Sequence, residues 1–172
     1  RRNLIDKIGG FLFEESFFCY YEETDFCHRA WLSGSEVHFV SGPPNQHYFG
    51  GTAGPHSGFA LGLYLSNMTF SLLGNLGAAA RWRIMPWFFA ILFASLVASL
   101  LKLKFPQAGA HLKAFACCFT QAGRIRERQA LVRRIRKVSD REILAKTLRN
   151  PGPAYFLKTL TGKLGSYRDR PL

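Results

Sequence analysis

The sequence predicts an all-α membrane protein: one to two transmembrane helices, an acidic N-terminal arm, a basic amphipathic C-terminal helix and an extended tail. Two largely apolar stretches, 57–80 and 84–104, lie in the middle of the 172-residue chain. Charge is divided unevenly around them. Residues 1–56 carry seven acidic and four basic side chains, whereas residues 57–172 carry 19 basic and four acidic ones. A basic half is typical of proteins that contact anionic lipid, nucleic acid or an acidic protein surface.

This distribution divides the chain into three segments. Residues 1–56 form an acidic, aromatic arm and a Gly/Pro loop, residues 57–105 contain the membrane-embedded helices, and residues 106–172 contain basic amphipathic helices and a C-terminal arm. The chain begins with Arg1 and not with an initiator Met, so we expect a processed or partial product.

The N-terminal arm mixes Phe and Tyr with acidic residues, and its apolar spacing predicts a short helix within 1–34. Residues 41–58 contain three prolines and several glycines, which predicts a linker. The spacing of the cysteines fits neither a zinc site nor a redox pair, so we expect free thiols. The four cysteines are Cys19, Cys27, Cys117 and Cys118.

The first apolar stretch has no charged residue from Ser57 to Ala80, which is long enough to cross a bilayer. It contains several Ser, Thr and Asn residues, so we expect protein neighbours, in a spanning, re-entrant or protein-buried helix. Small residues recur at four-residue intervals, a pattern that favours close helix packing against the second helix and a partner subunit. This predicted packing face consists of Gly58, Gly62 and Ser66.

The second apolar stretch is uncharged from Ile84 to Leu101. Tryptophans at one end and lysines at the other are typical of the two membrane interfaces. The predicted interface anchors are Trp82, Trp87, Lys102 and Lys104. Pro86 falls in the expected first turn of this helix, where the missing N–H has no cost. Together these features favour a transmembrane helix over a buried helix of a soluble core.

Small side chains gather on one half of the second helix, where another polypeptide backbone can approach closely. This predicted packing face consists of Ala90, Ala94, Ala98, Ser95 and Ser99. The opposite half, which we expect to face lipid, consists of Phe89, Leu92, Phe93, Leu96, Val97 and Leu100.

Pro106 is expected to end the second helix, and residues 124–138 predict a basic amphipathic helix. Its basic residues are Arg124, Arg126, Arg128, Arg133, Arg134, Arg136 and Lys137. Such a helix after a membrane span is typical of a surface bound to anionic headgroups; nucleic-acid phosphate or an acidic protein are the alternatives. Ser139 and Glu142 have the spacing of a capping box and predict a short helix to about Leu148.

The basic half is expected on the matrix side of a mitochondrial inner membrane, which corresponds to the cytoplasmic side. One full span would place the acidic and basic halves on opposite sides, whereas two spans would place both in the matrix.

The five histidines are scattered, and neither an HExxH nor a phosphate-loop motif occurs. We therefore expect no enzyme activity, no metal site, and no cofactor beyond a bound phospholipid such as cardiolipin.

The pattern as a whole is similar to the accessory subunits of mitochondrial respiratory complexes and ATP synthases, which are small, basic, Phe-rich chains with one or two membrane helices. This likeness is one of type and transfers no residue roles. It predicts a non-catalytic subunit whose partners are other subunits of a large membrane complex and anionic phospholipids. The alternatives are a mitochondrial ribosomal protein that binds rRNA through its basic half, and a membrane translocase or channel component.

Overall fold

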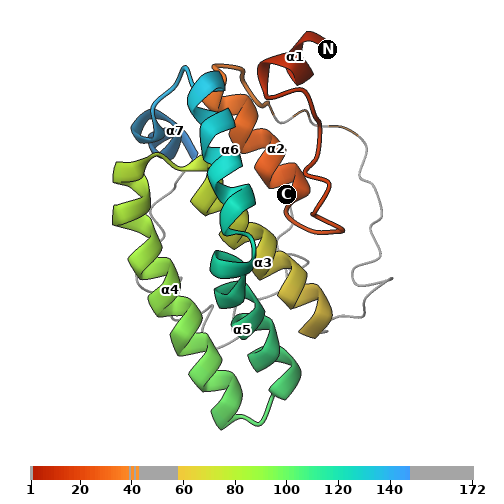
Figure 1. Ribbon diagram of the computed structural model, residues 1–172, viewed down its shortest axis with the longest axis vertical. Helices are drawn as coiled ribbons and strands as arrows, with labels where there is room; N and C mark the ends of the chain where they lie inside the picture. Colours follow the sequence, from red (N-terminus) through yellow and green to blue (C-terminus); the bar gives the residue numbers. More distant parts are fainter. Residues whose placement is uncertain (1, 39, 41, 43–57, 148–172) are drawn as a thin grey trace.

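The computed structural model describes residues 2–38, 40, 42 and 58–147, and all of its regular elements are helices (Figure 1). The helices are α1 (Arg2–Lys7), α2 (Glu22–Leu32), α3 (Gly58–Asn75), α4 (Ala78–Leu101), α5 (Phe105–Thr120), α6 (Ala122–Ile135) and α7 (Asp140–Thr147). The all-α prediction is confirmed for this part of the chain, including the short helix expected within 1–34. Most of the 41–58 loop and the tail beyond residue 147 lie outside the described residues.

The turn between the two apolar helices lies at residues 76–77, not at 81–83, so the predicted bounds are wrong at both ends of this turn. Gly77 fixes the turn because its N–H donates to Asp140 Oδ2 at 2.9 Å, and a Cβ there would lie 2.7 Å from the same oxygen. Arg81 fits inside α4 because its guanidinium donates to the Leu73 carbonyl at 3.0 Å. Pro86 therefore lies within α4 and not in its first turn.

α5 is longer than the short segment expected after the second apolar helix. The prediction that Pro106 ends the second apolar helix is wrong, because α4 already ends at Leu101; Pro106 lies in the first turn of α5, where its missing N–H is tolerated. α4 and α5 thus form an antiparallel hairpin (Figure 1). The cap predicted before α7 is confirmed, because the Ser139 hydroxyl accepts the Glu142 N–H at 3.3 Å and donates to Glu142 Oε1 at 2.8 Å.

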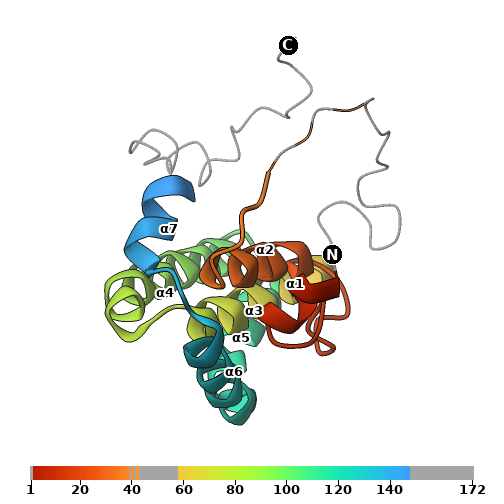
Figure 2. The ribbon, with the colours of Figure 1, turned by 90° about the horizontal axis from the view of Figure 1, so that it is seen from above.

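α3 lies at the centre of the fold, packed against α2, α5 and α6 (Figure 2). Two small apolar clusters hold these helices together. One contains Phe17, Phe70, Cys117 and Ile125, and the other contains Leu32, Val132 and Ile143. The fold therefore has a polar end, made by α2 and α6 on α3, and a hairpin end made by α4 and α5.

Candidate functional site

α4 is the one helix in the described part of the chain that is long and apolar enough to cross a membrane. Its most apolar 18-residue window has a mean hydropathy of 2.2, yet only 11% of that window is buried. A soluble core helix of this composition would be covered by neighbours, because burial of apolar surface drives folding in water. The large exposed side chains of α4 are Trp82, Trp87, Ile91, Phe93, Val97, Leu100 and Leu101.

α3 does not qualify as a second membrane span. The buried polar side chains Asn67, Thr69, Ser71 and Asn75 of α3 have partners inside the protein. Asn67 donates to the carbonyls of Cys19 and Tyr20 at 3.0 and 2.8 Å, and Thr69 donates to Leu65 at 2.7 Å. The contacts of Asn67 hold a turn in which Tyr20 has a φ of 71°. The first apolar stretch is therefore a protein-packed helix, as its polar content indicated.

The small face of α3 packs on α5 and not on the second apolar helix, so the predicted partner is wrong. A Cβ on Gly58 would lie 2.5 Å from the Pro106 carbonyl oxygen, and one on Gly62 would lie 3.6 Å from the Ala110 Cα. One turn further along, the Ser66 carbonyl accepts the Cys117 thiol at 3.5 Å. The three small residues thus share one interface, within the chain.

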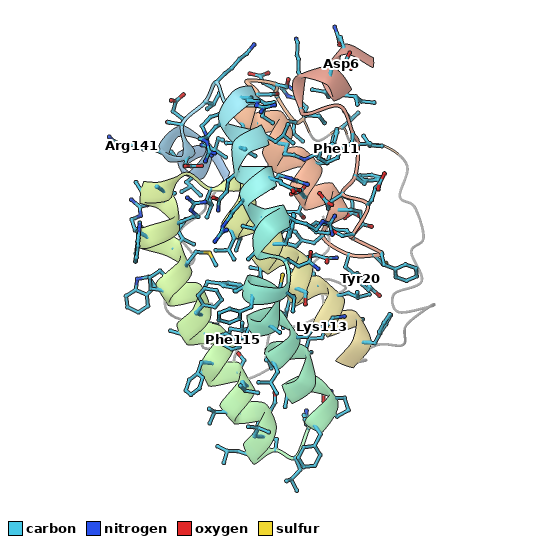
Figure 3. The ribbon with its side chains drawn as sticks, in the orientation of Figure 1. Asp6, Phe11, Tyr20, Lys113, Phe115 and Arg141 are labelled. Atoms are coloured by element: carbon cyan, nitrogen blue, oxygen red, sulfur yellow. The ribbon has the colours of Figure 1, made fainter. Side chains whose placement is uncertain are left out.

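The half of α4 predicted to face lipid is divided in the structure: Phe93, Val97 and Leu100 are exposed, whereas the other three large side chains are turned inward. Leu92 and Leu96 are buried, and Phe89 stacks on Phe115 of α5 with ring centroids 5.6 Å apart (Figure 3). These large side chains were expected to face lipid, but in the hairpin they provide the contact with α5. Ala90 and Ala94 remain exposed, on the side of α4 that no described helix covers.

The other small residues of α4 line a groove of about 690 Å³ between α4 and α5, which Leu61 of α3 also borders. Ser95, Ala98 and Ser99 form one wall, and His111 belongs to the other. His111 is 7% exposed, and its Nδ1 has no hydrogen-bond partner among the described residues. Such a buried polar atom costs about 1–3 kcal/mol when it stays unpaired.

The predicted anchors lie at opposite ends of α4. Trp82 and Trp87 are 82% and 73% exposed near its first turns, and Lys102 and Lys104 are exposed in the turn that leads to α5. This is the arrangement expected of a helix that meets water at both ends.

A buried charge cluster joins the acidic arm to the basic helix. The Arg128 side chain is only 2% exposed, and its guanidinium donates to both oxygens of Asp25, at 3.0 and 2.9 Å. Arg29 donates to Asp25 at 2.9 Å and to three carbonyls of the arm. Asp25 also accepts from Ser71 and Asn75 at 2.8 and 2.7 Å. We name Asp25, Arg29, Ser71, Asn75 and Arg128 the charge cluster.

Every charge in the cluster has an oppositely charged partner, and Glu14 supplies a second carboxylate to Arg128 from outside the cluster. Burial alone would raise the pKa of Asp25, but the nearby Arg128 and Arg29 guanidinium groups outweigh it and lower that pKa. The Phe11 ring contacts both guanidinium groups. The guanidinium carbon of Arg29 lies 4.3 Å from the ring centroid and that of Arg128 lies 5.1 Å from it. In Figure 3, Phe11 comes from the arm in front of α2. Asp25 therefore stays ionised at neutral pH.

Arg128 thus points into the protein, although the sequence placed it with the headgroup-binding residues. Two more of those residues have partners within the chain: Arg124 pairs with Glu14, and Arg136 pairs with Asp140 at 2.8 Å. The exposed basic residues of this region are Arg124, Arg126, Arg133, Arg134 and Lys137, of which Arg124 is paired with Glu14. Fewer basic side chains are therefore available to an outside partner than the seven that the sequence predicted.

The same ion pairs place the acidic arm and the basic helix on one side of the molecule. Residues 14 and 25 contact residues 124 and 128, so the arrangement with the two halves on opposite sides of a membrane is wrong for this fold. Part of the charge asymmetry in the sequence is therefore explained by ion pairs between the acidic and basic halves of the same chain. A sequence signal was present: Asp25 and Arg29 have the i,i+4 spacing of a helical ion pair, as do Ser71 and Asn75 for a shared helix face.

The described residues contain no group of three or more His, Cys, Asp or Glu side chains that could hold a metal ion. Comparison with known proteins finds no match: no family model, no curated protein and no solved structure corresponds to this chain. The fold and surface define an all-helical protein with one candidate membrane-spanning helix, and function has to be argued from that geometry.

Proposed function

We propose that this chain is a non-catalytic accessory subunit of a mitochondrial inner-membrane respiratory complex or ATP synthase, which stabilises the assembly and binds anionic lipid. The observation that carries the proposal is α4, an apolar helix whose surface the described part of the chain leaves largely uncovered. Lipid tails and the helices of neighbouring subunits are the surroundings in which such a surface is stable.

The dimensions of α4 support this placement. Its uncharged part, residues 84–101, is about 27 Å long at 1.5 Å per residue, close to the ~30 Å of a bilayer core. Tryptophans and lysines then fall near the two interfaces. The buried share of α4 argues against a soluble core, in which this composition would be enclosed.

The charges of the polar end support the orientation. Arg81 and Arg83 begin α4 at the end where Gly77 contacts α7, and the exposed basic residues of α6 and its C-terminal extension belong to the same part of the fold. Under the positive-inside rule this end faces the matrix, where basic side chains contact anionic headgroups. The mitochondrial assignment itself is proposed from the likeness of type and the basic composition.

The first experiment is carbonate extraction of the native membrane, followed by mass spectrometry of the complex that co-migrates on a native gel. We expect the chain to stay in the membrane pellet and to migrate with subunits of one inner-membrane complex. Release into the supernatant together with ribosomal proteins would contradict the proposal and favour the rRNA-binding alternative.

The second experiment tests for a subunit contact on the exposed small side chains of α4. Ala94→Phe should detach the chain from its complex and leave membrane insertion intact, because a bulky ring prevents close helix approach. Val97→Phe is the matched control, since Val97 is also exposed on α4 but already bulky. Unchanged assembly of the Ala94 variant would show that this side is not an interface.

A further inference from the structure

The groove between α4 and α5 has an apolar part and a basic end. Ile91 and Leu61 line the apolar part, and Lys102 and Lys104 line the basic end, with no acidic residue among the lining side chains. An apolar ligand without charge would leave these lysines unmatched. The combination selects an amphiphile with an apolar chain and an anionic head.

The wall of the groove also contains polar side chains. His111 lies in the wall of the groove, is more than nine-tenths buried, and has no partner for its Nδ1 among the described residues. Buried polar groups in proteins are nearly always hydrogen-bonded. Ser99, which is also nearly buried, borders the same space. Among the described residues, His111 Nδ1 is thus a buried polar atom of the groove wall that has no partner.

We propose that this groove binds one anionic phospholipid. Its phosphate lies at Lys102 and Lys104, and an acyl chain lies along Ile91 and Leu61, past the part of the wall that contains His111. The inference deepens the proposed function and rests on the membrane placement of α4. It adds a defined lipid site in the leaflet opposite the basic surface of α6.

The dimensions agree with this ligand. From Ile91 to Lys102 the helix rises about 16 Å at 1.5 Å per residue, close to half of the ~30 Å bilayer core and thus to one leaflet. His111 lies about 9 Å along α5 from Phe105 by the same rise, which places it at the level of the acyl chains of that leaflet. The small side chains Ser95 and Ala98 leave the width that an acyl chain needs.

The test uses the full chain in nanodiscs that contain equal amounts of phosphatidylcholine and phosphatidylglycerol, with retained lipid counted by native mass spectrometry after transfer to detergent. The wild-type protein should retain phosphatidylglycerol in preference to phosphatidylcholine. Lys102→Gln with Lys104→Gln should weaken this retention roughly 30-fold, since a lysine near an anionic headgroup contributes about 1 kcal/mol and 1.4 kcal/mol is a factor of ten.

Two controls separate the groove from other causes. Lys7→Gln with Arg141→Gln removes the same charge from exposed positions outside the groove and should leave retention unchanged. Ala98→Phe should fill the groove and expel the lipid without a change in charge, whereas Val97→Phe, one residue away and outside the groove, should not.

Equal retention of phosphatidylglycerol by the groove variants and the wild type would overturn the lipid site, as would equal retention of both lipids by the wild type. Carbonate extraction of the same variants separates the two proposals. If the wild-type chain stays in the membrane while the groove variants keep their lipid, only the groove inference fails. If the wild-type chain is extracted, the proposed function and the groove fail together.

Discussion

The two ends of this molecule reverse the usual relation between side-chain polarity and exposure. At the α2–α3–α6 end, Asp25, Arg29 and Arg128 are almost completely buried. At the α4–α5 end, Phe93 and Leu101 are 60% and 80% exposed. The charges are buried because each has a partner within the chain, whereas the apolar side chains are exposed because, among the described helices, α4 packs mainly against α5. The polar side chains of one end therefore have their partners within the chain. The apolar side chains of the other end need lipid or another protein to cover them.

The largest effect should come from breaking the charge cluster. Arg128→Leu leaves the Asp25 carboxylate buried with fewer partners, so we expect the free energy of unfolding to fall by about 3–5 kcal/mol. Chemical denaturation in detergent measures this change. Arg126→Leu, on the exposed side of the same helix, should stay within about 0.5 kcal/mol. Equal effects of the two substitutions would show that the cluster does not stabilise the fold.

An intermediate effect should come from the contact between α3 and α5, which joins the two ends. Gly58→Ala places a Cβ 2.5 Å from the backbone oxygen of Pro106, so the helices must shift. We expect a loss of about 1–3 kcal/mol in unfolding free energy. Gly62→Ala meets only ordinary contacts at 3.6 Å and should be neutral or slightly stabilising, because Ala favours the helix. The thermal unfolding midpoint should therefore fall in the Gly58→Ala variant and stay the same or rise slightly in the Gly62→Ala variant.

The smallest effect should be a dependence of stability on pH. Burial lowers the pKa of His28 below its ordinary value of 6.5. The unfolded chain then binds the proton more readily, so stability falls as the pH drops through 6.5. The pKa of Asp25 is also lowered, so the stability it contributes is lost only at a pH below its ordinary value of 3.8.

His28→Gln tests the first of these two steps. Unfolding free energy measured between about pH 8 and pH 5 should decline in the wild-type protein and decline less in this variant. The loss of unfolding free energy that accompanies protonation of Asp25, at lower pH, should occur in both proteins. An identical decline in the two proteins over the upper range would assign the titration to another group.

Local patterns predicted the parts of the fold that depend on neighbours in sequence. The Ser139 cap and the apolar character of α4 are local features, and both could be read directly. The partner of α3 could not be predicted, because Gly58 and Gly62 favour close approach to any helix without specifying which. The inward direction of Arg128 also depends on Asp25, about 100 residues earlier in the chain. Such pairings are decided by the tertiary fold.

The central claim is that the exposed side of α4 lies in hydrocarbon. The direct measurement is labelling of Phe93→Cys by a water-soluble maleimide in intact membranes, with the four native cysteines replaced by alanine and Arg126→Cys as the exposed reference. A thiol in hydrocarbon does not ionise and does not react. The account predicts labelling at position 126 in membranes, and labelling at position 93 only after the protein is denatured. Equally fast labelling at both positions in intact membranes would contradict it.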